Sequence, residues 1–351
     1  MTNAAQIRPV KPRVTSFDVS RGIAITFMVI GHSVTAVENT ILGVSPFWTT
    51  FNEVFHTIRM PLFFFLAGVF LVSTLKKLGY RNWLVDKAQY LLYPWLVWSL
   101  IRGLLEVGLY EIGIGSPMSL GEMVYGIVWD PRIWYLPALF ISFAVVGGGY
   151  AASRGWKWWP LVMLGALAAL VVLTYLPWWP PMLHVHPFSL YMLAGVVLAP
   201  LAIQTAGLSR GKAATVAAGA LFVFGVVVGY LLPTGLLLDN SSLAFIVCAV
   251  LGVVGFLALG RVLDGLLVGR GLERLGRWSL VIYVVHAIPV SLARTLLMKV
   301  GIDDYTVLVL IPAAFGIAVP ALLGWLNDRG HLRWLITMPG YRRSAVTTRL
   351  P

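Results

Sequence analysis

Apolar stretches alternate along this chain with connections whose charge depends on which side of a membrane they would face. Ten stretches approach the roughly 20 apolar residues that a membrane helix needs. They are 17–37, 53–75, 84–108, 133–151, 159–176, 187–206, 213–232, 241–260, 277–298 and 305–326. If both termini and every second connection are placed on one side, 21 of the 26 Lys and Arg residues fall there, and nine of the 14 acidic residues fall on the other side. Because Lys and Arg collect in cytoplasmic connections, this pattern predicts an all-α polytopic bundle of about ten transmembrane helices with both termini in the cytoplasm.

The composition agrees with a membrane protein. The chain is 59% hydrophobic and 11% charged, against roughly a quarter charged in an average soluble domain. Its net charge of +12 fits basic loops that face anionic headgroups, so we expect membrane lipids and no nucleic acid as partners. We expect a multi-pass membrane protein; the oligomeric state is not indicated.

Three parts follow from the span pattern. Residues 1–16 form a basic cytoplasmic tail, 17–326 a transmembrane domain, and 327–351 a second basic cytoplasmic tail. The longest connections are 109–132 outside and 261–276 inside. The first is too polar and too rich in glycine for a span, so we interpret it as a lid or a re-entrant element.

Ionisable residues inside spans are costly and are therefore functional candidates. The first span carries Asp18, Arg21 and His32. Eleven residues are close to three helical turns, so Arg21 and His32 share one helix face at roughly 16 Å along the axis. Asp18 lies one turn before Arg21 and can pair with it. A snorkelling Arg21 and a structural His32 are the alternatives, but the pair favours an anion-holding cation at the cytoplasmic mouth and a proton acceptor deeper in the membrane.

The second span opens with Glu53, His56 and Arg59, on neighbouring turns. It enters from outside, so we expect His56 at a depth similar to His32. No third and fourth ligand has convincing spacing, because His184 and His186 lie in a loop, and we expect no metal. His286 falls in the middle of a later span, one turn after Tyr283, where structural bonding and a place in a substrate chamber are both possible.

Basic residues also precede the third span. Arg81 and Lys87 enter the membrane from inside, and next to Arg21 they would form a pocket for a phosphorylated cytosolic ligand. Ordinary topogenic charge is the alternative for both.

Five stretches in order resemble the membrane acyltransferase-3 family, closest to its sugar O-acetyltransferase (fucose 4-O-acetylase-like) branch. They are FDVSRGIAITFMVIGH, FHTIRMPLFFFLAGVFL, KAQYLLYPWLVW, WYLPALF and GRWSLVIYVVHA, and the resemblance covers roughly 17–326.

The resemblance implies a membrane enzyme that takes an acyl group from cytosolic acyl-CoA and delivers it to a hydroxyl of a carbohydrate or glycolipid. The essential Arg and His of the family's first helix match Arg21 and His32. Many members carry Arg-x-x-Arg before the third span, where this chain has Lys87 and Tyr90, so the second position departs from the family pattern.

A thioester is already activated, so the chemical need is a general base for the acceptor hydroxyl, which a neutral His supplies. We therefore expect direct transfer, and the resemblance implies acetyl-CoA as the donor. The single cysteine, Cys248, lies far along the chain in an apolar span, which argues against an acyl-cysteine intermediate.

The candidates fall into three sets. The catalytic set is His32, His56 and Glu53. The CoA-binding set is Arg21, Lys87 and Arg81. The substrate-binding set is Arg59, Tyr283, His286, Trp134 and Tyr135, of which Arg59 and Tyr283 are also candidates for stabilising the oxyanion. Two alternatives remain: a transporter or flippase of a lipid-linked sugar, and transfer of a succinyl or longer acyl group.

Overall fold

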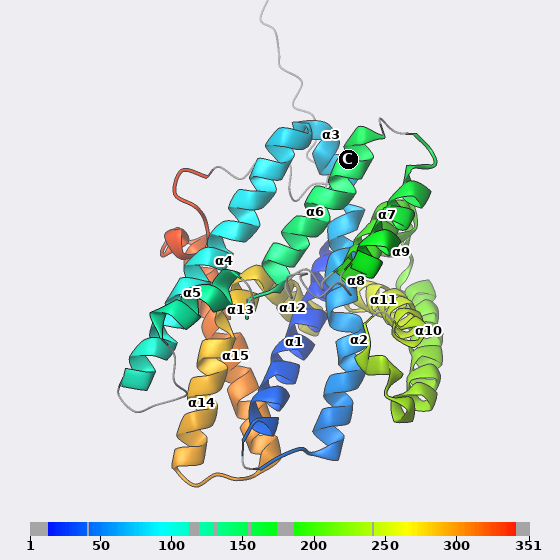
Figure 1. Cartoon of the computed structure of the whole chain (residues 1–351). Helices are drawn as coiled ribbons and strands as arrows, with labels where there is room; N and C mark the ends of the chain where they lie inside the picture. The colour runs from blue at the N-terminus through cyan, green and yellow to red at the C-terminus, as the bar shows by residue number, and fades with distance from the viewer. Residues whose placement is uncertain are drawn as a thin grey trace, which may run out of the picture.

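The structure is a computed structural model that describes residues 13–40, 42–111, 119–128, 132–153, 156–173, 186–240 and 242–341. These residues form helices and connections without a strand, which confirms the all-α prediction (Figure 1). The helices are α1 (Thr15–Glu38), α2 (Pro46–Val69), α3 (Leu71–Leu78), α4 (Tyr80–Glu111), α5 (Leu120–Val128), α6 (Tyr135–Ala152), α7 (Trp159–Leu173), α8 (His186–Val197), α9 (Ala199–Ala206), α10 (Arg210–Leu231), α11 (Leu243–Leu263), α12 (Leu267–Arg277), α13 (Ser279–Val285), α14 (Ala287–Lys299) and α15 (Tyr305–Asp328). Single 3₁₀ turns lie at Leu232–Thr234, Leu236–Leu238 and Arg333–Leu335.

The protein is a multi-pass membrane protein by the length and composition of its helices. Within the described residues, six helices are long and apolar enough to cross a membrane. The number rises to eight if each of two bent pairs is one span: Phe188–Val197 with Ala199–Ala206, bent by 73°, and Ser279–Val285 with Ala287–Lys299, bent by 49°. The other two predicted stretches correspond to α4 and α7, so the count of ten stays a prediction.

Two connections contain helices that the sequence did not predict. The connection 261–276, which the charge pattern predicts to be cytoplasmic, includes most of α12, an amphipathic helix with Arg270, Arg274 and Arg277. The 109–132 connection contains α5, which begins at a Ser119–Glu122 capping pair. Residues 112–118 and 129–131 lie outside the described residues, so the lid prediction is not tested.

Helix α1 is at the centre of the bundle, with 15 buried residues and contacts to α2 and α11–α15. Its beginning touches α12 backbone to backbone. A Cβ atom on Gly22 would lie 2.0 Å from the Leu272 carbonyl oxygen, and one on Gly276 would lie 1.8 Å from the Asp18 carbonyl oxygen. Small residues allow such contact between helices in membranes, and here they fix α12 against the start of α1.

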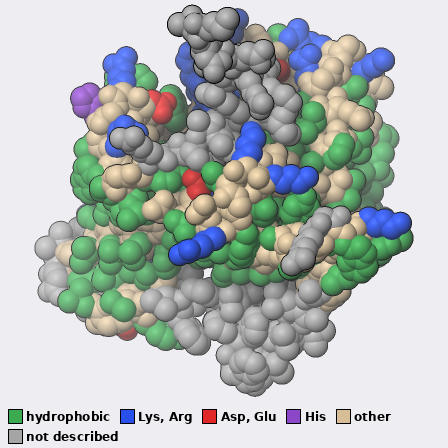
Figure 2. All heavy atoms as spheres, turned by 90° about the horizontal axis from the view of Figure 1, so that it is seen from above, with side chains coloured by type: hydrophobic (Ala, Val, Ile, Leu, Met, Phe, Trp, Pro, Cys, Tyr) green, Lys and Arg blue, Asp and Glu red, His purple; other side chains and the backbone are tan. Residues whose placement is uncertain are grey.

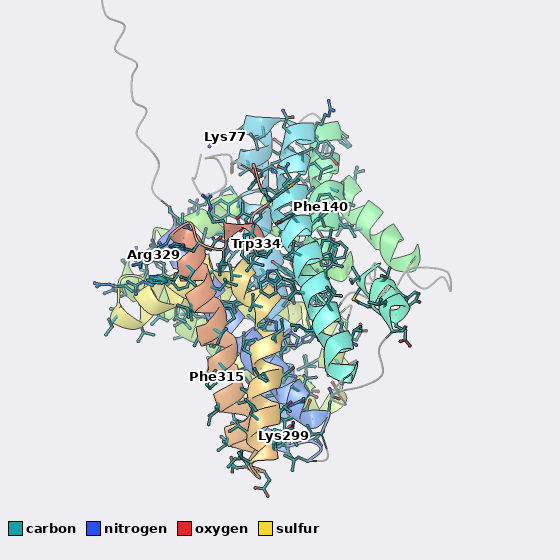
Figure 3. The ribbon with its side chains drawn as sticks, turned by 90° about the vertical axis from the view of Figure 1, so that its left-hand side faces the viewer. Lys77, Phe140, Lys299, Phe315, Arg329 and Trp334 are labelled. Atoms are coloured by element: carbon teal, nitrogen blue, oxygen red, sulfur yellow. The ribbon has the colours of Figure 1, made fainter. Side chains whose placement is uncertain are left out.

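The outer faces of several helices expose apolar side chains, as lipid contact requires. On α15 the exposed residues include Leu310, Phe315 and Leu322, and Figure 3 shows Phe315 on the outside of the bundle. Lys77 and Lys299 lie at opposite ends of the molecule (Figure 3). The face seen from above in Figure 2 carries many Lys and Arg side chains and few acidic ones.

We expect Lys77 to face the cytoplasm and Lys299 the outside, because basic residues alternate along the chain. Both side chains are exposed, so Lys77→Cys and Lys299→Cys, each on a Cys248→Ala background, form a matched pair. In intact cells an impermeant maleimide should label Lys299→Cys only, and after lysis both. Labelling of Lys77→Cys alone in intact cells would reverse the topology.

Candidate functional site

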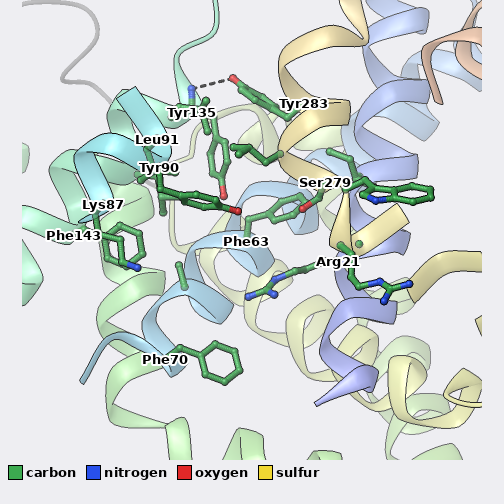
Figure 4. Close-up of a pocket in the computed structure, with 18 of the residues that line it drawn as sticks. Arg21, Phe63, Phe70, Lys87, Tyr90, Leu91, Tyr135, Phe143, Ser279 and Tyr283 are labelled. Carbon is green, nitrogen blue, oxygen red and sulfur yellow. Dashed lines mark hydrogen bonds between the residues drawn. The ribbon is translucent and has the colours of Figure 1, made fainter. Parts of the chain in front are cut away.

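A cationic cavity of about 370 Å³ opens between α1, α2, α4, α6 and α13 (Figure 4). Four basic residues line it: Arg13, Arg21, Lys87 and Arg277. Asp328 is the acidic residue in its described lining, so cations outnumber anions. We call it the inner cavity, because all four basic residues come from parts of the chain that the charge pattern places inside.

A buried carboxylate holds two of these cations. Asp18 is 1% exposed and pairs with Arg21 at 3.3 Å, which confirms the predicted pairing. The same carboxylate accepts a hydrogen bond from Arg13 Nη2 at 2.9 Å. The Arg21 side chain stays 25% exposed, so its guanidinium retains donors that a ligand can use.

Lys87 reaches the inner cavity from the opposite wall. Its ammonium lies 3.4 Å from Asp86 and 5.5 Å from the centre of the Phe143 ring. Asp86 also accepts a 2.7 Å hydrogen bond from the Tyr341 hydroxyl, so the segment after α15 packs against α4. Tyr90, at the position where the family pattern departs, lines the same cavity. Arg81 is exposed and lies beside Asn82 and Asp86 outside it.

A second cavity of about 370 Å³ contains two histidines. His32 is exposed to this second cavity. Neither of its two ring nitrogens has a hydrogen-bond partner within the described residues. The His286 ring centre lies 5.0 Å from that of His32. We call this the outer cavity, because its lining continues to Asn39 at the far end of α1.

The hydrogen bonds of His286 define its neutral tautomer. Its Nδ1 lies 2.8 Å from the Tyr283 carbonyl oxygen and 3.1 Å from that of Ile282. Since both partners can only accept, Nδ1 carries the proton. The lone pair of the neutral ring is then on Nε2.

The two cavities meet at one side chain. Tyr283 lines both of them, and its ring lies 5.1 Å from that of Tyr135. Three helices run from one cavity to the other, since α1 contributes Arg21 and His32, α4 contributes Lys87 and Arg102, and α13 lines both. The sequence predicted that Arg21 and His32 share one face of the first helix. In the structure these two residues line different cavities, which meet at Tyr283.

The predicted substrate residues fall on both sides of this wall. Trp134 and His286 line the outer cavity, and Tyr135 lines the inner one. Trp134 and Tyr135 are adjacent in the chain, and α6 begins at Tyr135. This helix therefore starts at the wall between the two cavities.

The three candidates on α2 lie outside the described linings of both cavities. His56 Nε2 is 3.1 Å from Asn240 Oδ1. Arg59 is buried and donates to the Phe27 carbonyl oxygen at 3.2 Å and to Asn52 Oδ1 at 2.9 Å, which ties α2 to α1. The structure therefore does not bring Glu53, His56 or Arg59 into the same cavity as His32.

An ion-pair cluster at the outer cavity was not predicted. Glu106 accepts from Arg102 at 3.0 Å and from Arg132 at 2.6 Å, and both arginines line the cavity. The spacing of Arg102 and Glu106 by one helical turn was the available signal. Among the described residues no group of three His, Cys, Asp or Glu side chains is placed to hold a metal.

The sequence matches the acyltransferase domain family of the acyltransferase-3 type over residues 14–326. The chain therefore belongs to this acyltransferase family. It is also similar to the nodulation protein NolL of Mesorhizobium japonicum, with 26% identity over 204 residues. That match covers 57% of this chain and 52% of the relative, so the chain spans about half the length of the curated relative it matches. No solved structure matches the chain.

We expect the Arg59 contact to support the fold around His32. A Cβ atom on Gly31 would lie 1.8 Å from Arg59 Nη1, so Gly31→Ala should displace the guanidinium. Both Gly31→Ala and Arg59→Met should destabilise the protein by about 1–3 kcal/mol, because buried acceptors lose their donor. The double variant should lose less than the sum, since both changes break one contact.

Thermal unfolding in detergent measures this effect. Gly219→Ala is the matched control, because a Cβ atom there meets open space. An Arg59→Met protein that melts like the wild type would show that Arg59 has no structural role and would return it to the substrate-binding candidates.

Proposed function

We propose that this protein transfers an acetyl group from cytosolic acetyl-CoA to a hydroxyl of a carbohydrate or glycolipid, in the bacterial cytoplasmic membrane. The proposal rests on the cationic inner cavity and the two-histidine outer cavity, which share the wall at Tyr283. It places the donor on one side of this wall and the acceptor on the other. The predicted span number of ten and the cytoplasmic termini are part of the proposal.

The inner cavity suits the phosphates of CoA. Guanidinium groups bind phosphate through paired hydrogen bonds, and ammonium groups bind it as point charges. Arg21 and Lys87 face each other across the cavity, and Arg13 and Arg277 add charge beside Arg21. Arg81 would contact only a part of the ligand that extends past the cavity. The pantetheine arm would run among Phe63, Tyr90 and Leu139 toward Tyr283.

His32 is the proposed general base. Its ring is open to the outer cavity, so a bound hydroxyl can donate to it. The hydroxyl oxygen attacks the thioester carbon while its proton passes to His32. The tetrahedral intermediate then loses the CoA sulfur as the C–S bond breaks, and His32 returns the proton to that sulfur.

His286 would stabilise the charged state of His32. Its Nε2 lone pair can accept a hydrogen bond from the imidazolium that forms in the adjacent ring. The residues His56 and Glu53 would act indirectly, by stabilising α2 in its position against α1. Cys248 lines neither cavity, in line with direct transfer rather than an acyl-cysteine intermediate.

Labelled acetyl-CoA with purified protein and a membrane lipid extract tests the proposal. We expect free CoA to appear together with an acetylated glycan or glycolipid that mass analysis identifies. Turnover with succinyl-CoA or a longer acyl-CoA and none with acetyl-CoA would change the donor. Release of CoA without an acylated carbohydrate would reject the acceptor class.

Loss of a cation at the inner cavity should weaken donor binding. We predict that Arg21→Ala raises the KM for acetyl-CoA by at least about tenfold, because a charged hydrogen bond contributes about 1.5–3 kcal/mol. Lys87→Ala should act in the same direction but more weakly. Calorimetry with CoA gives the affinity directly, and Arg270→Ala, an exposed arginine of α12 outside the cavity, is the control. Equal CoA affinity in all three variants and the wild type would reject this pocket.

Loss of His32 should stop transfer without stopping binding. We predict that His32→Ala keeps its fold and its CoA affinity but transfers at least about a hundredfold more slowly, the usual contribution of a general base. His56→Ala should reduce the rate less. The wild-type rate should fall toward acid pH, as the base becomes protonated.

His331→Ala is the matched control, because His331 is exposed and lies outside both cavities. A folded His32→Ala protein that binds CoA and transfers at the wild-type rate would move the base elsewhere. His286 would then be the next residue to replace.

A further inference from the structure

Tyr283 has a position that no other described residue shares. It is the one residue common to the described linings of the two cavities, and it is buried. In Figure 4 its hydroxyl lies in the upper part of the view, with Arg21 and Phe70 lower. If donor and acceptor occupy the two cavities, their reacting atoms must meet beside this side chain.

The hydroxyl of Tyr283 is held as an acceptor. The backbone N–H of Tyr135 donates to it at 3.0 Å, shown by the dashed line in Figure 4. Within the described residues no acceptor for the hydroxyl proton of Tyr283 is present. The proton is therefore available to a ligand, and the bond from the amide polarises the O–H group and makes it a stronger donor.

The surroundings keep this hydroxyl in place. The ring of Tyr283 packs edge-on against Tyr135, and its carbonyl oxygen accepts from His286 Nδ1. His286 in turn faces His32. The Tyr283 hydroxyl at the wall is therefore one helical turn from His286, which lies next to His32 in the outer cavity.

We propose that the Tyr283 hydroxyl donates a hydrogen bond to the thioester carbonyl oxygen and stabilises the negative charge that develops on it during transfer. This inference rests on the proposed function. As the acceptor oxygen bonds to the carbonyl carbon, the C=O electron pair moves onto the carbonyl oxygen, and the Tyr283 hydroxyl stabilises that charge by donating a hydrogen bond to it. Tyr283 keeps its proton throughout, and the electron pair returns when the C–S bond breaks.

A donor aimed at the developing charge acts on the chemical step and not on ground-state binding. Removal of one oxyanion donor costs about 10²–10³ in kcat. In a tyrosine that served only as a wall between the cavities, loss of the hydroxyl would lower stability, because the Tyr135 N–H would lose its acceptor, but it would leave kcat unchanged, since the ring would still fill the space.

Tyr283→Phe is the direct test, with Tyr191→Phe as the matched control. Tyr191 is buried on α8 outside both cavities, so it should keep the wild-type rate. We expect Tyr283→Phe to bind CoA as tightly as the wild type, with unchanged KM for acetyl-CoA and a kcat reduced about a hundredfold or more.

Site-specific 3-fluorotyrosine at position 283 separates donation from a structural bond. It keeps the group that accepts from Tyr135 but is a more acidic donor, so kcat should rise while the KM for acetyl-CoA stays constant. A kcat equal to that of tyrosine, together with a full rate in Tyr283→Phe, would overturn the inference. A wild-type protein that releases no CoA from acetyl-CoA would instead reject the proposed function itself.

Discussion

Backbone contact between α1 and α12 determines where the inner cavity lies. Gly22 and Gly276 let the two helices approach without any side chain between them. The residues next to these glycines, Arg21 and Arg277, are thereby brought to the same cavity. The amphipathic helix α12 thus supplies part of the cationic lining. Asp18 pairs with Arg13 and Arg21 and offsets part of the repulsion between these two arginines.

Helix α1 connects the inner cavity to the outer cavity. A helix rises about 1.5 Å per residue, so α1 carries an arginine at one depth and a histidine much deeper without any change of element. The wall between the cavities comes from other elements, since Tyr135 begins α6 and Tyr283 lies in α13. In the proposed reaction, a division of this kind would keep the thioester away from water until the acceptor is in place.

The features that the sequence predicted correctly depend on local spacing. The pairing of Asp18 with Arg21 follows from helical geometry and is present, and each predicted apolar stretch coincides with a helix or a consecutive pair. The proximity of His32 to His286 depends on how α1 and α13 pack, and no spacing encodes it. The hydrogen bonds of Arg59 to the Phe27 carbonyl oxygen and the Asn52 amide oxygen likewise depend on how α1 and α2 pack, and its role in substrate binding stays a prediction.

In the proposed reaction the donor reaches the wall at Tyr283 from the inner cavity and the acceptor reaches it from the outer cavity. Electron cryo-microscopy with a thioether analogue of acetyl-CoA, which cannot transfer its acyl group, tests this directly. We expect the CoA phosphates to lie against Arg21 and Lys87, and the analogue's carbonyl oxygen to lie within hydrogen-bond distance of the Tyr283 hydroxyl. Density for CoA in the outer cavity, or an acyl end remote from Tyr283, would contradict it.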